Sequence, residues 1–206
     1  MLLSLRYQHV SQRFVFVLLV FFSWTYSFGQ EYSHKFSKTK VSIEHNTYDG
    51  YQTEFDFSEE IVRKAMWKHF SKFSRVSNER SHYIFEIPDS ENEGNVNLML
   101  FATIQASPNL TTIRLALKDQ DLSADLKSKY MIQLQSLLKT FKKSFYVGHY
   151  QEKVDASVKQ ASKLSKKYER QLKSKGNDKT SILTELKAEE QEIERLRIII
   201  ISIAAQ

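Results

Sequence analysis

SADLKSKYMIQLQSLLKTFKKSFYVGHYQEKVDASVKQASKLSKKYERQLK, residues 123–173, is one unbroken helical pattern without a proline. In its first half, apolar residues recur every three or four positions and form a dense stripe: Leu126, Tyr130, Leu134, Leu137, Leu138, Phe141 and Phe145. In its second half, the stripe narrows to a seam typical of paired helices: Val154, Val158, Ala161, Ser165, Tyr168 and Leu172. We therefore expect one helix that packs into a globular core at its start and into a helical pair at its end.

A second helix follows after a short loop. Residues 176–180 (GNDKT) supply a helix C-cap and then a new N-cap. The apolar seam of the second helix consists of Ile182, Leu186, Glu189 or Glu190, Ile193, Leu196, Ile200 and Ile203. Because so short a loop forces neighbouring helices to run antiparallel, we expect a coiled-coil hairpin. In an antiparallel pair, the residue number rises along one helix as it falls along the other, so two facing residues have numbers with a constant sum. We expect this sum to be about 354, which places Val158 opposite Leu196 and Val154 opposite Ile200.

Residues 198–201 are four consecutive isoleucines, which point all the way round a helix. Only Ile200 belongs to the seam. The predicted register brings this end of the hairpin beside Gly148, where the absence of a side chain would let a second element come close. We expect Ile198, Ile199 and Ile201 to dock there and to tie the hairpin to the globular core.

The chain before the long helix shows a mixture of strand and helix signals. Alternating apolar residues predict a strand or a hairpin over 41–57, and short strands at 83–87, 96–105 and 113–117. Between them, Ser58 starts a helix as its N-cap. The apolar face of that helix consists of Ile61, Val62, Ala65, Met66, Phe70 and Phe73, with Trp67 at its edge. The order β-α-β-β-β-α predicts an α+β domain, an antiparallel sheet with helices on one face.

Residues 1–29 have the pattern of a secretory signal peptide. Arg6 and Arg13 supply a positive start, residues 14–22 an apolar core, and Ser27-Phe28-Gly29 a small-x-small cleavage junction. The alternative is a signal that is kept as a membrane anchor, but the apolar run is shorter than the roughly 20 residues of a membrane span. We therefore expect a periplasmic or secreted protein.

After the signal, we expect an α+β domain at 30–147, which includes the first half of the long helix, and an antiparallel helical hairpin at 148–206. The whole chain of 206 residues is 41% apolar and 26% charged, which is ordinary for a globular protein. Cysteine is absent, which excludes disulfides, thiolate metal ligands and lipidation at a cysteine. The charge is uneven: residues 30–122 carry 11 bases and 14 acids, while residues 123–206 carry 17 bases and 10 acids.

We find no catalytic, metal or cofactor motif. Residues 89–94 (DSENEG) look like the start of a calcium loop, but its twelfth position would be Leu100, which supplies no carboxylate, so we interpret them as a turn. Five histidines follow the signal and never pair at metal-ligand spacing: His34, His45, His69, His82 and His149. The isolated glycines exclude a P-loop and a nucleophile elbow. A pair of carboxylates that meets only in space stays open.

Basic residues form a stripe along the second half of the long helix: Lys159, Lys163, Lys166, Arg170 and Lys173. Such a stripe can bind anionic polymers, lipid headgroups or nucleic acid. The predicted register, however, brings acidic residues of the second helix beside the stripe, and such pairing orients helical hairpins. Aromatic residues do not interleave with it, so we expect no nucleic-acid partner, and no membrane contact once the signal is cleaved. Lys163, Lys166 and Arg170 are the candidate partner-facing residues.

Several of these features together resemble secreted α+β proteins with a helical hairpin from the Bacteroidota. The features are the Ser-x-Gly-Gln junction at 27–30, a strand with Gly50-Tyr51, a helix that holds Trp67, three further strands and a charged helical hairpin. The resemblance implies an extracytoplasmic location. It implies no activity, because the group has no established one to transfer.

We therefore expect a binding or structural module of the cell envelope that acts through protein–protein contact, without catalysis or a cofactor. Its partner is an envelope protein that the sequence does not identify, and the hairpin offers a route to homo-oligomers. One alternative is an envelope hydrolase with a dispersed carboxylate site, which a strongly perturbed carboxylate would favour. Another is a carrier of a small apolar ligand, which a cavity lined by Phe141, Phe145 and Leu100 would favour.

Overall fold

The computed structural model describes residues 32–33, 35–88, 97–108, 110–119, 122–173 and 179–206. Three features predicted above lie outside these ranges: the signal at 1–29, the acidic turn at 89–94 and the helix caps around 176. The secondary structure elements all belong to one compact unit, residues 34–206.

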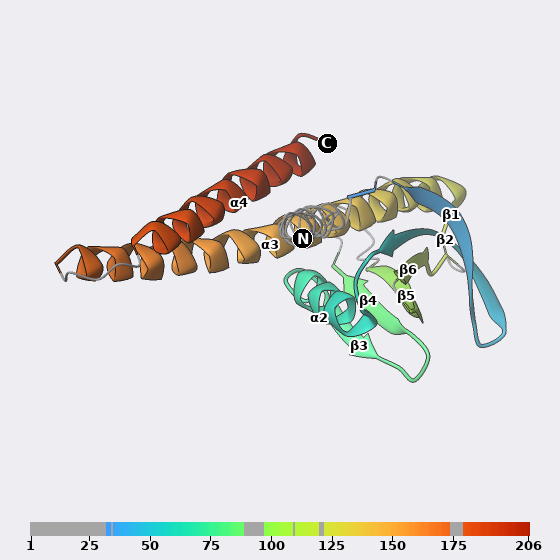
Figure 1. Ribbon diagram of the computed structural model, residues 1–206. Helices are drawn as coiled ribbons and strands as arrows, with labels where there is room; N and C mark the ends of the chain where they lie inside the picture. The colour runs from blue at the N-terminus through green and yellow to red at the C-terminus, as the bar shows by residue number, and fades with distance from the viewer. Residues whose placement is uncertain (1–31, 34, 89–96, 109, 120–121, 174–178) are drawn as a thin grey trace, which may run out of the picture. The chain divides into compact units, whose positions relative to one another are not determined.

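Six strands form one antiparallel sheet (Figure 1). They are β1 (Phe36–Ile43), β2 (Asn46–Phe55), β3 (Arg75–Asn78), β4 (Tyr83–Ile87), β5 (Leu98–Ser107) and β6 (Leu110–Leu117), in the spatial order β1-β2-β6-β5-β4-β3. The helices of the described chain are α2 (Glu59–Phe70), α3 (Ala124–Lys173) and α4 (Lys179–Ala205). The predicted α+β class is confirmed, with its antiparallel sheet and its long helical pair. The strand or hairpin predicted at 41–57 is the β1–β2 hairpin, and β3 was not predicted.

One face of the sheet carries the main core, and α2 and the first half of α3 cover it (Figure 1). Phe55 of β2 lies under α3, with its ring centroid 5.5 Å from that of Phe141 and 5.1 Å from that of Phe145. Phe85 of β4 stacks on Phe70 of α2 at 4.4 Å. Aromatic pairs of this kind add roughly 0.5–1.5 kcal/mol each to the free energy of burial. The dense apolar stripe of the long helix is therefore the part that builds the domain.

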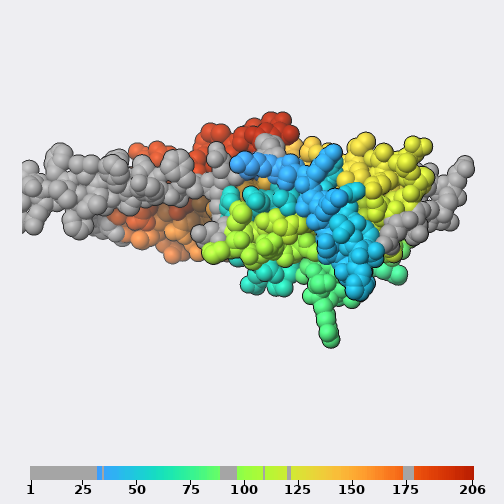
Figure 2. Space-filling model, turned by 90° about the vertical axis from the view of Figure 1, so that its right-hand side faces the viewer, coloured from blue at the N-terminus to red at the C-terminus, as the bar shows by residue number. Residues whose placement is uncertain are grey.

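The opposite face of the sheet holds a second, smaller apolar cluster near the β1–β2 turn. The cluster consists of Val41, Ile43, Tyr48, Phe101 and Ala116, with Ile84 against it. The ring centroids of Tyr48 and Phe101 are 4.8 Å apart, and Figure 2 shows the hairpin (blue) beside the lime strands β5 and β6. A Cβ on Gly50 would lie 2.2 Å from the backbone oxygen of Leu115. Glycine at this position therefore permits the close approach of β2 and β6.

Lys142 of α3 is buried within the main core. Its Nζ donates to Thr53 Oγ1 at 2.9 Å, and that hydroxyl donates to the backbone oxygen of Lys35 at 2.9 Å. The Nζ also lies 5.4 Å from the ring centroid of Phe36 and 5.7 Å from that of Phe55, within cation–π distance. Burial lowers the pKa of Lys142 to about 8, and the nearby carboxylates of Asp56 and Glu54 oppose that shift. The lysine thus connects β1 and β2 to α3.

After Tyr150, α3 continues alone with α4 as an antiparallel helical pair (Figure 1). On α4, the seam residues face α3 and are buried or half-buried: Ile182, Leu186, Glu189, Ile193, Leu196, Ile200 and Ile203. The side chains on the outward faces are mostly polar. Within the described residues, no helix is both long enough and apolar enough to cross a membrane.

The seam of α3 differs from the predicted one. Its buried or half-buried residues after Tyr150 are Val154, Ser157, Ala161, Leu164, Ser165, Tyr168 and Gln171. The predicted seam residues Val158 and Leu172 are instead 44% and 54% exposed. The cause is the direction in which each side chain points around the helix axis. Alternating steps of four and three residues return to the same side of a helix. Starting from the buried Tyr150, these steps reach positions 154, 157, 161 and 164. The prediction was wrong at Val158 and Leu172 because it followed apolar side chains rather than these steps.

The pairing between the two helices also differs from the predicted register. Lys143 Nζ donates to the backbone oxygen of Ala204 at 2.5 Å, and these position numbers sum to 347. The predicted sum was about 354. Val158 does not pack on Leu196, since Leu196 is buried and Val158 is not.

The C-terminal isoleucines do not dock on the domain as predicted. Ile203 is buried, but Ile198 and Ile201 are 58% and 67% exposed. Within the described chain, a Cβ added to Gly148 would meet nothing within 4 Å. The reason is helix geometry. Tyr150 faces α4, and Gly148, two residues earlier, points to the other side because successive residues turn by about 100°.

Candidate functional site

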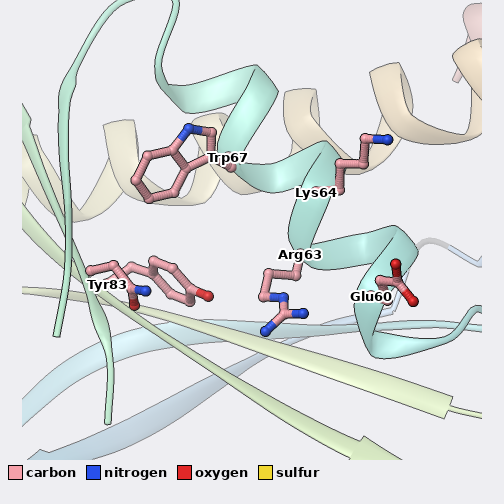
Figure 3. Close-up of a pocket in the computed structure, with 6 residues that line it drawn as sticks. Glu60, Arg63, Lys64, Trp67 and Tyr83 are labelled. Carbon is pink, nitrogen blue, oxygen red and sulfur yellow. The ribbon is translucent and has the colours of Figure 1, made fainter. Parts of the chain in front are cut away.

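A groove lies on the flank of α2, between this helix and the β3–β4 hairpin (Figure 3). It is open to solvent and has a volume of about 360 Å³. Its walls are formed by Glu60, Arg63, Lys64 and Trp67 of α2, Asn78 of β3 and Tyr83 of β4. The groove therefore combines two aromatic rings with three charged groups and one amide.

The sequence of α2 explains why one wall of the groove is exposed. Ser58 precedes the helix in an extended conformation, and Glu59 and Glu60 lie in the first turn, where the helix dipole favours acids. Val62, Met66 and Phe70 recur every four residues and are the buried residues of the helix. Because successive residues turn by about 100°, Arg63 and Trp67 lie beside this buried stripe rather than within it. They are held at the edge of the core by the residues that α2 buries.

The β3–β4 hairpin supplies the other wall. Asn78 and Tyr83 face each other across the hairpin as the last pair of its register. The Tyr83 ring lies 6.2 Å from the Trp67 ring at an interplanar angle of 73°, an edge-to-face arrangement. Tyr83 is half-buried and Trp67 is 41% exposed, so both rings leave apolar surface open to a ligand.

The charged groups of the groove are free to meet a ligand. Arg63 makes only a long ion pair with Glu59, 4.0 Å between nitrogen and oxygen, and both side chains are substantially exposed. Figure 3 shows the Arg63 guanidinium on the strand side of α2, between Tyr83 and Glu60, whereas Lys64 points away from the strands. The residues that line the groove include no serine, cysteine or histidine. The groove therefore presents aromatic, charged and amide side chains to a ligand.

The sequence prediction missed this groove. It placed Trp67 at the edge of the apolar face of its helix, which is correct, but it assigned no strand between that helix and the strand at 83–87. β3 carries only four residues, of which Arg75, Ser77 and Asn78 are exposed, so it has no strong alternation. The available signal was the polar turn before Tyr83, which is typical of a tight hairpin.

Lys163, Lys166 and Arg170, the partner-facing residues expected from the sequence, are exposed on α3. Among the described residues, none of the three has an ion pair with α4. The acids of α4 are engaged differently: Glu192 pairs with Arg195 of its own helix at 2.7 Å. This pairing, together with Lys153 of α3, holds the pKa of Glu192 below its usual value. The three candidate residues of the basic stripe thus remain exposed.

A serine–histidine contact joins α2 to α3. Ser144 Oγ lies 3.2 Å from His69 Nδ1. The same hydroxyl donates to the backbone oxygen of Phe141 at 2.9 Å, so its proton is directed to its own helix. Burial, with a contribution from Lys72, lowers the pKa of His69, which keeps the imidazole neutral near pH 7. This contact fastens the two helices and does not activate the serine.

Three other histidines lie in different parts of the described fold, and His34 lies outside the described residues. His45 is exposed at the β1–β2 turn, and His82 is buried against Phe101 at a centroid distance of 5.3 Å. The His149 ring lies 4.5 Å from the Phe57 ring, and burial lowers its pKa. Among the described residues, no three histidine, cysteine or acidic side chains are grouped so that they could hold a metal ion.

The place where a carrier would hold its ligand is filled by side chains. Leu100, Phe141 and Phe145 are all buried, and the two rings lie 6.3 Å apart against each other. Phe145 and Phe57 are closer still, at 4.8 Å. The interior around these rings is therefore packed, whereas the groove beside α2 is open and can accept a ligand.

Comparisons with protein-family models, with curated proteins and with solved structures give no match to this chain.

Proposed function

We propose that this protein is an exported module of the cell envelope that binds another protein, and that the groove between α2 and the β3–β4 hairpin is its contact surface. The observation that carries this proposal is the meeting of Trp67, Tyr83 and Arg63 in one open groove. Tryptophan, tyrosine and arginine dominate the binding energy of protein interfaces. An exposed tryptophan also loses apolar contact with water when a partner covers it, which favours binding.

Exposed apolar side chains are dense around the same short helix. Eight large hydrophobic side chains of the described chain are exposed, and three of them, Ile61, Trp67 and Phe73, lie on α2 or in the turn after it. The other five are spread over α3, which has 50 residues, and α4, which has 27. Exposed apolar residues that gather in one region mark interaction surfaces more often than scattered ones do, which supports α2 as a binding element.

The pattern of residues 1–29 supports export to the periplasm or beyond, because it combines a positive start, an apolar core and a small-x-small junction. In this setting, the α3–α4 pair acts as a coiled-coil stem. Its exposed Lys163, Lys166 and Arg170 offer a second, electrostatic contact surface, through which the stem can also meet another copy of the chain. The groove is the primary site, and the stem is secondary.

Capture experiments with matched variants test the proposal. The full chain, expressed with its own signal and a C-terminal tag, is cross-linked in cells and purified from the envelope, and its partners are identified by mass spectrometry. We expect a specific partner that is lost with Trp67→Ala and with Arg63→Ala. Thr140→Ala, an exposed change outside both contact surfaces, should leave the same partner bound.

Two results would contradict the proposal. The first is a partner whose capture is unchanged by both groove variants but is lost when Lys163, Lys166 and Arg170 are replaced together. The second is recovery of the tagged protein from the cytoplasm with residues 1–29 still attached. Circular dichroism of each variant shows whether its fold is intact, so that a lost partner reports on the groove.

A further inference from the structure

β3 is an edge strand of the described sheet, and the pattern of its hydrogen bonds can be derived from its turn. The sheet order ends with β4-β3, so only β4 pairs with β3. The backbone N–H of Glu79 donates to the oxygen of His82 at 2.9 Å, which marks the first hydrogen-bonded pair of the hairpin. Hydrogen-bonded and non-bonded pairs alternate along antiparallel strands. Asn78 and Val76 therefore turn their N–H and C=O groups away from β4, toward the free edge.

The same two residues face the groove side of the sheet. Val76 lies opposite Phe85, which stacks on Phe70 of α2, and Asn78 lies opposite Tyr83, which lines the groove. Directly opposed residues project to the same face of a sheet. A strand added along β3 would thus bond to Val76 and Asn78 through its main chain. Every second side chain of that strand would point to the face where the groove opens.

The charge around this edge favours an acidic strand. Residues 59–80, which form α2, the turn after it and β3, carry six bases and three acids. The rest of residues 30–122 carries five bases and eleven acids. Residues 59–80 are therefore net positive, and the rest of residues 30–122 is net negative, although its first strand and the residue before it carry Lys35, Lys38 and Lys40. The positive charge beside the groove and the β3 edge would attract an acidic partner.

We propose that the partner presents an extended acidic segment, which adds to the sheet as a strand beside β3 and places one aromatic or aliphatic side chain in the groove. Main-chain bonds to Val76 and Asn78 would supply affinity, and the pocket beside Trp67 and Tyr83 would select the inserted side chain. Arg63, whose guanidinium lies on the strand side of α2, would meet a carboxylate beside it. This inference rests on the proposed function, since it names the chemistry of the partner that binds the groove.

The test uses a defined probe and two variants at one position. The probe is the fluorescent peptide DEVYVED, whose valines favour an extended chain, and its matched control is KKVYVKK. Asn78→Pro removes the outward N–H but no bond to β4, whereas Asn78→Ala removes the side chain and keeps the N–H. Fluorescence anisotropy should show binding of DEVYVED that weakens about tenfold or more with Asn78→Pro and with Trp67→Ala. Asn78→Ala should have a smaller effect, and KKVYVKK should bind at least about tenfold more weakly.

Hydrogen exchange on the unaltered full chain gives a second measurement that does not depend on the proline variant folding. Binding of DEVYVED should slow the exchange of the Val76 and Asn78 amides, but not that of the edge amides of β1. Peptide binding that depends on Trp67 but leaves both amides unprotected would overturn strand addition. Equal or tighter binding of KKVYVKK would overturn the acidic preference. Failure of both peptides to bind, with partner capture in cells still dependent on Trp67, would overturn this inference and leave the proposed function standing.

Discussion

The two halves of α3 have the same backbone and opposite structural roles. Eight of its residues up to Tyr150 are buried, among them Tyr130, Leu138, Phe141 and Phe145, whereas only Val154 and Leu164 are buried beyond it. The first half is covered by a sheet and a second helix, and the second half by α4 alone. A helix thus acquires its stability from what covers it rather than from its own sequence propensity. Four tests by substitution can break or sharpen this comparison.

The largest effect is expected in the first half. Phe141→Ala removes a buried ring that contacts Phe55 and Phe70, and should lower the free energy of unfolding by about 3–5 kcal/mol. Urea unfolding followed by near-ultraviolet circular dichroism measures the change. Thr140→Ala, the exposed neighbour, should change it by less than about 0.5 kcal/mol. Equal effects at the two positions would contradict the packed core described for this half.

A smaller effect is expected in the second half, where the seam can be tested directly. Leu164→Ala should cost about 2–4 kcal/mol because Leu164 is buried between α3 and α4. Val158→Ala should cost less than about 0.5 kcal/mol because Val158 is exposed. Thermal unfolding of the two variants decides between the seams. If Val158→Ala proves the more damaging, the seam predicted from the sequence is right and the one described here is wrong.

Lys142 gives a pH-dependent effect within the first half. Its folded-state pKa of about 8 lies below the ordinary value of 10.5, so burial of the cation destabilises the fold fully below pH 8, and the penalty is lost as the pH rises toward 10.5. Between pH 7 and about 9.5, stability should rise by up to about 2 kcal/mol. Lys142→Met should abolish this rise. Unfolding curves at both pH values provide the measurement, and a rise that persists in the variant would assign it to another group.

The smallest effect is expected at the outer surface of α4. Replacing Ile198 and Ile201 together by serine should change the free energy of unfolding by less than about 0.5 kcal/mol per site, since both side chains are exposed. Leu196→Ser, on the buried side of the same helix, should cost several times more. Calorimetry of both variants tests the contrast. A cooperative loss of stability in the double serine variant would show that these isoleucines are buried after all.

The sequence was sufficient where one physical signal dominated. The dense stripe of the long helix, the alternation over 98–105 and 113–117 and the apolar face at Val62, Met66 and Phe70 each predicted an element that the structure contains. The phase of the seam was not predictable in this way. It depends on Tyr150, whose direction is fixed by the sheet and α4 and not by the residues that follow it. Apolar character at Val158 and Leu172 was therefore misleading.

The candidate site was harder to predict than the fold because it joins elements that are distant in the chain. Trp67 carried a signal, since an apolar ring at the edge of a buried stripe is exposed on one side. Asn78 and Tyr83 gave little sequence signal of a site. The strand β3 is short and mostly polar, and its pairing with β4 is defined only in the folded chain. The charge excess of residues 59–80 was present in the sequence but was hidden by the negative balance of residues 30–122.

Because α3 is one unbroken helix, its length sets the distance between its two ends. A helix of 50 residues extends about 75 Å at 1.5 Å per residue, and residues 151–173 account for roughly 35 Å of it. A stiff helical spacer keeps its two ends apart, whereas a flexible linker lets them meet. A ligand held at the domain and a second molecule held at the hairpin tip would therefore be kept several nanometres apart by one covalent rod. Shortening the pair by whole turns would change that reach without altering either contact surface.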